Sequence, residues 1–165
     1  MISSFFGRLF PFVFIIFFIY FELAPIYFFE SELVRPLMTF TTVYCWILND
    51  KRKFRPLWLI FFGLFYDLLK DGIVGITALF FLGMYHLQNK SSGFIFSVDF
   101  KEIWIRFTAV LFLYSSLLFI ANFFFEDFSY NVFKNLISFV LTIILFPLFH
   151  SVIQKISSKF GSFSE

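Results

Sequence analysis

The chain has 165 residues, of which 60% are hydrophobic and only 15% are charged, and its mean hydropathy is +0.88. A soluble domain of this size could not bury so much apolar surface, whereas a bilayer accepts it, because a spanning helix satisfies its backbone hydrogen bonds internally. The net charge of +2 and the lack of a basic patch interleaved with aromatic residues argue against nucleic-acid binding. We therefore expect an integral membrane protein that forms a single polytopic domain over residues 1–165, with almost no soluble part.

Six apolar segments follow one another along the chain, separated by short charged breaks. They cover residues 9–29, 33–48, 56–69, 72–87, 103–125 and 135–153. A full crossing takes about 20 residues, so the first, fifth and sixth segments are long enough. The other three must thin the bilayer, use flanking residues or cross incompletely. The expected fold is all-α, a compact bundle of about six transmembrane helices.

The third and fourth segments are separated only by Lys70, Asp71 and Gly72. They are expected to form a tight helical hairpin, which is either two crossings or one re-entrant pair. The first segment follows Arg8 and has bulky aromatic residues where a signal peptide would need a small-residue cleavage site, so we interpret it as a retained span. Glu22 stands close to Pro25, near the expected end of the first helix, and we place it at the membrane interface.

The orientation follows from the uneven distribution of Lys and Arg. With the N-terminus in the cytoplasm, ten of these residues fall in inner segments and three in outer ones. Cytoplasmic loops carry the excess of Lys and Arg, so both termini are expected in the cytoplasm. The most basic inner loop would lie against anionic headgroups. It contains Lys51, Arg52, Lys53 and Arg55.

Polar residues recur at helical spacing on three of the segments. The second segment carries Arg35, Thr39, Thr42, Trp46 and Asn49, the fifth carries Thr108, Ser115 and Asn122, and the sixth carries Asn135, Ser138 and Thr142. Small and hydroxyl side chains let membrane helices approach and hydrogen-bond with one another. These stripes are interpreted either as packing within the bundle or as a docking face for the transmembrane helix of a partner.

Asp67 is the most notable polar residue, because a charged side chain at the centre of a spanning helix costs roughly 2.5–3.5 kcal/mol. It lies three residues before Lys70, near the outer boundary, and Gly63 lies one turn earlier on the same face. Three roles remain open. Asp67 could cap the hairpin, serve as a structural or partner-binding carboxylate, or couple protons or ions.

The sequence offers no pattern that supports catalysis or metal binding. His86 and His150 have no carboxylate at ligand spacing, and Cys45 is the only cysteine. No nucleophile–base arrangement or phosphate-binding glycine loop is present. We expect a protein that is not an enzyme and that has no metal and no cofactor.

Residues 35–76 carry motifs in an order and spacing that resemble the bacterial rod shape-determining MreD family. In that family an Arg-Pro pair opens an apolar span that ends near a Trp, a Gly-x-x-x-Asp-Leu-Leu segment follows, and a Gly comes eight positions after the Asp. The matching positions here are Arg35, Pro36, Trp46, Gly63, Asp67 and Gly75. The resemblance implies partner-binding or structural roles for these residues.

The resemblance further implies a non-enzymatic scaffold subunit of the cell-wall elongation machinery that regulates cell shape. It would reside in the bacterial inner membrane with both termini in the cytoplasm. The implied partners are an MreC-like single-span membrane protein, the filament protein MreB, the glycosyltransferase RodA and a class B transpeptidase, together with membrane lipid but no nucleic acid. A homodimer remains open.

Two other functions remain as alternatives. The main one is the membrane-embedded substrate-binding component of a vitamin uptake transporter, which would need convergent polar groups on the outer side. A membrane enzyme that acts on lipid is disfavoured, because paired carboxylates are missing.

Overall fold

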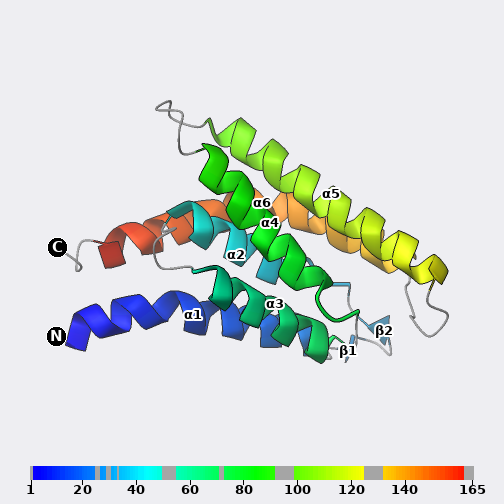
Figure 1. Cartoon of the computed structure of the whole chain (residues 1–165), viewed down its shortest axis with the longest axis horizontal. Helices are drawn as coiled ribbons and strands as arrows, with labels where there is room; N and C mark the ends of the chain where they lie inside the picture. Colours follow the sequence, from blue (N-terminus) through cyan, green and yellow to red (C-terminus); the bar gives the residue numbers. More distant parts are fainter. Residues whose placement is uncertain are drawn as a thin grey trace.

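The computed structural model describes residues 2–24, 27–28, 31–32, 34–49, 55–70, 73–91, 99–124 and 132–161. Within these ranges the chain forms one helix for each of the six apolar segments (Figure 1). The elements are α1 (Ile2–Leu23), β1 (Tyr27–Phe28), β2 (Ser31–Glu32), α2 (Met38–Asn49), α3 (Pro56–Leu69), α4 (Ile76–Ser91), α5 (Phe100–Phe124) and α6 (Val132–Gly161). The helical architecture was predicted, whereas the short antiparallel pair β1–β2 was not.

Successive helices run in opposite directions through the bundle (Figure 1). The start of α1 and the end of α6 lie at one end, and β1 and β2 lie at the other. We call the second end the β-hairpin end. The C-terminal ends of α1, α3 and α5 and the N-terminal ends of α2, α4 and α6 gather there, and this arrangement brings residues that are distant in the sequence close together.

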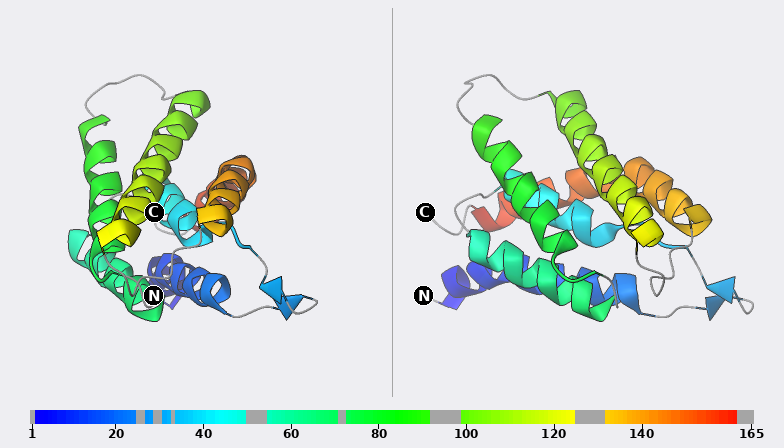
Figure 2. Two further views of the ribbon diagram at one scale, coloured as in Figure 1. Left: turned by 90° about the vertical axis from the view of Figure 1, so that its right-hand side faces the viewer. Right: turned by 45° about the vertical axis from the view of Figure 1, so that its right-hand side comes forward.

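The central element is α2, which contacts α1, α4 and α6 (Figure 2). Every residue from Thr39 to Ile47 is buried. Thr39, Thr42 and Trp46 of the predicted polar stripe therefore face the inside of the bundle and are not available to a partner helix, whereas Asn49 at the end of α2 is exposed. For these three residues, packing within the bundle describes the structure.

The lengths of the apolar helical stretches agree only in part with the three full-length spans that were predicted from the sequence. Among the described residues, two helical stretches are long and apolar enough to cross a membrane, Phe100–Ala121 and Val132–Ser157. These belong to the fifth and sixth predicted segments. The shorter apolar stretches are Leu9–Leu23 of α1, Pro56–Leu69 of α3 and Ile76–Gln88 of α4. The helix α1 itself begins at Ile2 and is 22 residues long.

The core of the bundle is built largely from aromatic rings. Phe40 of α2 is fully buried and contacts the ring of Tyr114 of α5, with 4.4 Å between the ring centroids. It also contacts Phe81 of α4 at 5.1 Å. One turn later in α2, Tyr44 contacts the rings of Phe107 and Phe146, which stack with 4.2 Å between their centroids and join α5 to α6. The abundant phenylalanines thus fill both the interior and the outer surface of the bundle.

Candidate functional site

The α3–α4 hairpin is closed by Asp67, which lies in the last turn of α3 and is 4% exposed. Its Oδ2 atom accepts hydrogen bonds from the backbone N–H groups of Gly75, at 2.8 Å, and Thr77, at 3.1 Å. The first N–H groups of a helix have no partners within that helix, and a carboxylate is favoured there. Asp67 therefore caps α4 from the opposite arm of the hairpin, which is one of the three roles considered for it.

Two glycines allow this hairpin geometry. Gly75 has a φ of 101°, a backbone conformation that residues other than glycine rarely adopt. Gly63 lies directly against the backbone of Ala78 in α4, where no β-carbon could be placed. The Gly63 contact and the Asp67 cap thus hold α3 and α4 together at two successive levels.

A second carboxylate, that of Glu22, holds three helices together at the β-hairpin end. Glu22 lies at the end of α1, and its Oε2 atom accepts a hydrogen bond from the backbone N–H of Thr39, at 2.9 Å. Its Oε1 atom accepts a hydrogen bond from the hydroxyl of Tyr66, at 2.5 Å. Glu22 therefore caps the N-terminus of α2 and also binds a buried tyrosine of α3.

Arg35 lies just before α2 and binds the C-terminal end of α1, so it joins the same two helices as Glu22. Its guanidinium donates to the backbone carbonyl oxygen of Glu22 at 2.7 Å and to that of Phe21 at 3.3 Å. A cation is favoured at the C-terminus of a helix, so Arg35 stabilises the end of α1. Pro36 follows it and keeps the chain extended, because a residue before proline avoids the helical conformation. Arg35 was expected on the polar stripe of the second segment, but it precedes the helix.

The N-terminal half of α6 holds the segment between α1 and α2 in place. The hydroxyl of Ser138 donates to the carbonyl oxygen of Arg35. The hydroxyl of Thr142 accepts a hydrogen bond from the backbone N–H of Leu37 at 2.7 Å and donates to the carbonyl oxygen of Ser138 at 2.6 Å. Ser138 and Thr142, two of the three polar residues predicted as a stripe on the sixth segment, therefore bind the segment that leads into α2.

Lys70 extends from the end of α3 over the buried tyrosines. Its Nζ atom lies 3.5 Å from the Tyr66 hydroxyl and 5.3 Å from the centroid of the Tyr66 ring. The centroid of the Tyr114 ring is 5.9 Å away. An ammonium group is attracted to the face of an aromatic ring, so these contacts keep the charge of Lys70 next to Glu22.

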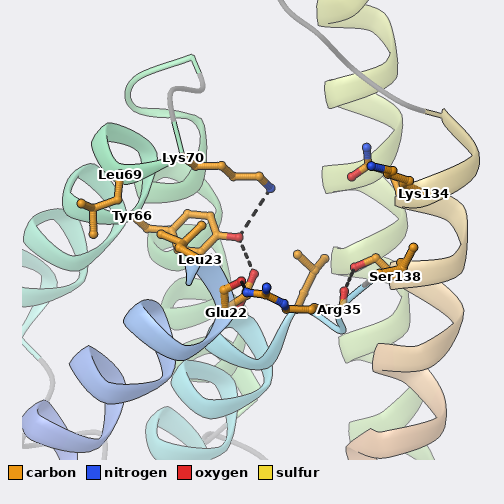
Figure 3. Close-up of a pocket in the computed structure, with 11 residues that line it drawn as sticks. Glu22, Leu23, Arg35, Tyr66, Leu69, Lys70, Lys134 and Ser138 are labelled. Atoms are coloured by element: carbon orange, nitrogen blue, oxygen red, sulfur yellow. Dashed lines mark hydrogen bonds between the residues drawn. The ribbon is translucent and has the colours of Figure 1, made fainter. Parts of the chain in front are cut away.

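These residues surround a pocket of about 430 Å³ at the β-hairpin end (Figure 3). Its lining comes from α1, the segment before α2, α3 and α6, and consists of Glu22, Leu23, Val34, Arg35, Leu37, Tyr66, Leu69, Lys70, Lys134, Asn135 and Ser138. Figure 3 shows Lys70 and Arg35 reaching toward the Tyr66–Glu22 pair. We call this space the polar pocket.

The predicted site residues divide into two groups. Arg35, Asp67 and Gly75 lie at the β-hairpin end, and Pro36 follows Arg35 there. Trp46 lies near the other end of α2, where its ring contacts those of Phe10 and Phe14. Of the basic loop, Arg55 is exposed before α3. Lys51, Arg52 and Lys53 lie outside the described residues.

Among the residues that line the polar pocket, only Arg35 was predicted as a site residue. Glu22 and Tyr66, which form its central hydrogen bond, were not. Glu22 was expected only at an interface, although its proximity to Pro25 did indicate where α1 ends. Tyr66 lies inside an apolar segment, where a tyrosine is not distinctive. Both are brought together by contacts over 44 positions of the sequence, and no local pattern indicates such a contact.

The described residues contain no group of three or more His, Cys, Asp or Glu that could hold a metal ion. The polar pocket joins one carboxylate to a tyrosine and several cations, and both oxygens of that carboxylate already accept hydrogen bonds. This arrangement connects helices and presents positive charge.

A comparison with protein-family models matches residues 3–156, almost the whole chain, to the model described as rod shape-determining protein MreD. Comparisons with curated proteins and with solved structures give no match.

Proposed function

Because the chain belongs to the MreD family of rod shape-determining proteins, we propose that it is a non-enzymatic scaffold subunit of the cell-wall elongation machinery. Members of this family are bacterial membrane proteins associated with the MreB and MreC shape machinery. In this proposal the chain crosses the inner membrane several times, and both termini and the basic loop face the cytoplasm. Its main partner is an MreC-like single-span protein, and RodA and a class B transpeptidase belong to the same complex.

The observation that supports a docking role is a groove of about 370 Å³ between α5 and α6. It is lined by Phe112, Ser115, Ser116, Phe119, Ile120, Val132, Asn135, Leu136 and Phe139. Most of its lining is apolar, and two adjacent serines lie on its α5 wall. Since Thr39, Thr42 and Trp46 of the stripe on α2 are buried, the outer faces of α5 and α6 are where a partner helix can reach polar and small residues.

A partner helix in this groove would gain more than lipid tails can supply. Small residues permit the close approach of two helix backbones, and hydroxyl groups add interhelical hydrogen bonds. Between membrane helices each such bond contributes roughly 0.6 to 2 kcal/mol. A single apolar helix is the occupant that fits a groove between two antiparallel helices.

The proposal is tested by purifying the chain from its host in mild detergent and measuring how much MreC-like protein accompanies it. Ser115→Phe places a phenyl ring in the groove and should reduce the amount of partner recovered. Leu117→Phe is the control, because Leu117 is exposed on the same helix but does not line the groove. Equal recovery in wild type and Ser115→Phe would reject the groove as the docking face. Depletion of the protein should turn rod-shaped cells into round, swollen ones.

One observation keeps the uptake function as a second candidate. The polar pocket is a set of convergent polar side chains at the end of the bundle that the proposed topology places outside, which is what capture of a small ligand would require. If the chain were isolated with a tightly bound vitamin and associated with an energising ATPase, the scaffold proposal would have to be abandoned. If depletion changed cell shape and left vitamin uptake intact, the scaffold would stand.

A further inference from the structure

Among the described residues that line the polar pocket, positive charge is in excess. They include three cationic residues, Arg35, Lys70 and Lys134, and one carboxylate, Glu22, which gives 3 − 1 = +2. Both oxygens of Glu22 already accept hydrogen bonds, one from Tyr66 and one from the backbone of Thr39. Asp67 is close in the sequence to Lys70, but it does not line the pocket and its Oδ2 atom holds the start of α4.

A helix end adds to this positive field. The pocket lies beside the N-terminus of α6, which begins at Val132. The N-terminus of α2 also lies there, but the N–H of Thr39 is already bound by Glu22 and does not contribute. Unpaired N–H groups give the N-terminus of a helix a partial positive charge, and this charge favours anions. Lys134 and Asn135 lie in the first turn of α6, so side chains and helix end act in the same direction.

The rest of the lining is apolar. Leu23, Val34, Leu37 and Leu69 form this part of the wall. A ligand that fits both parts has a negatively charged group and a hydrocarbon part. In a membrane, anionic phospholipids have this chemistry, because a phosphate head group is joined to hydrocarbon chains, and Lys and Arg side chains near the membrane surface attract such anionic head groups.

We propose that the polar pocket binds the phosphate group of an anionic membrane lipid, with Arg35, Lys70 and Lys134 as the cations that face it. Arg35 is held in place by two carbonyl oxygens of α1 and Lys70 by two tyrosine rings, so both are positioned before the ligand arrives. Lys134 is exposed and stands on the α6 side of the pocket (Figure 3). A bound head group would thereby bridge α3 and α6.

Native mass spectrometry of the full-length chain in mild detergent tests this proposal. Phosphatidylglycerol and phosphatidylcholine with the same acyl chains are titrated separately, and the dissociation constant of the first bound lipid is measured. Wild type should prefer phosphatidylglycerol. The double variant Lys70→Gln/Lys134→Gln should lose about tenfold in affinity for each charge-assisted hydrogen bond removed. Lys101→Gln is the matched control, because Lys101 is exposed at the opposite end of the bundle.

Equal affinity for the two lipids, or unchanged affinity in the double variant, would overturn the proposal. If Lys70→Gln disturbs folding, the single variant Lys134→Gln tests the proposal, since that side chain is exposed. It should still weaken phosphatidylglycerol binding. Inorganic phosphate is added as a competitor. Displacement of the lipid would show that the phosphate group alone is recognised, whereas retention of the lipid would show that its apolar part is required. Because lipid binding is measured on the isolated chain, its outcome is independent of the docking of an MreC-like partner.

Discussion

Gly63 of α3 lies so close to Ala78 of α4 that a β-carbon on Gly63 would be only 2.3 Å from the Cα atom of Ala78 and 2.5 Å from its backbone nitrogen. The neighbour is backbone, so it cannot rotate away as a flexible side chain could. This contact therefore determines how closely the two helices pack. It lies one turn of α3 before Asp67, whose carboxylate holds the start of α4.

Substitution of Gly63 should separate the hairpin. We expect Gly63→Ala to destabilise the chain by about 1–3 kcal/mol, the usual cost of overpacking, and Gly63→Leu to cost more. Gly83→Ala is the control, because Gly83 is an exposed glycine of α4 with open space around it. Thermal unfolding in detergent should show a lower midpoint for the Gly63 variants and an unchanged or higher one for Gly83→Ala. Equal midpoints for Gly63→Ala and wild type would contradict the close contact.

The role of Asp67 can be separated into hydrogen bonding and charge. Asp67→Asn keeps an oxygen that can accept the N–H groups of Gly75 and Thr77, so most of the protein level and of the shape-determining function should remain. Asp67→Leu removes the acceptor of the partly buried N–H of Gly75 and of the buried N–H of Thr77. The buried donor alone costs about 1–3 kcal/mol, so this variant should lose function. The measurements are the amount of membrane-inserted protein and the shape of cells that depend on it. Loss of function in Asp67→Asn at normal protein level would mean that the charge itself is required.

Two threonines of the bundle should respond differently to the same substitution. The Thr142 hydroxyl bonds the backbone of Leu37 and of Ser138, whereas the buried Thr42 hydroxyl has no hydrogen-bond partner among the described residues. Thr142→Val should therefore cost about 1–3 kcal/mol by leaving a buried N–H unpaired, and Thr42→Val should be neutral or stabilising. Unfolding in detergent compares the two. A larger loss in Thr42→Val would show that its hydroxyl has a partner.

Thr42→Phe is expected to prevent folding and so cannot report on partner binding. Thr42 is fully buried at the centre of the bundle, with 0% exposure, and overpacking by a whole ring costs more than a single methylene would. The membrane-inserted protein level should fall sharply in this variant and remain normal in Ser115→Phe. Normal levels of Thr42→Phe would contradict the central position of α2.

The topology proposed for the chain predicts the location of reporter fusions. Fusions after residues 53, 96 and 165 should report the cytoplasm, and fusions after residues 31 and 128 should report the outer side, because Lys and Arg concentrate in cytoplasmic loops. An external signal at residue 53 would overturn the whole assignment. A fusion after residue 71 distinguishes a hairpin that crosses the membrane twice from a re-entrant one.

Local patterns of the sequence were sufficient for the helices, and they placed a cap among the three roles considered for Asp67. Apolar runs give one helix each because hydropathy acts over consecutive residues, and Pro56 begins α3 because proline suits the first turn of a helix. The spacing between Asp67 and Gly75 is only eight positions, so a tight hairpin brings them together almost automatically. The family resemblance rested on the same short stretch, and the match over residues 3–156 confirms it.

Only the tertiary structure decided what surrounds α2 and where the polar pocket lies. The stripe of Thr39, Thr42 and Trp46 has the same spacing whether it faces a partner or its own bundle, so the sequence left both interpretations open. Glu22 meets Thr39 and Tyr66 across 17 and 44 positions, and such contacts depend on how the helices pack. In a membrane the apolar face of a helix is equally well satisfied by lipid and by protein. Hydropathy therefore determines that these segments are helices, and close packing with hydrogen bonding determines which of their faces meet.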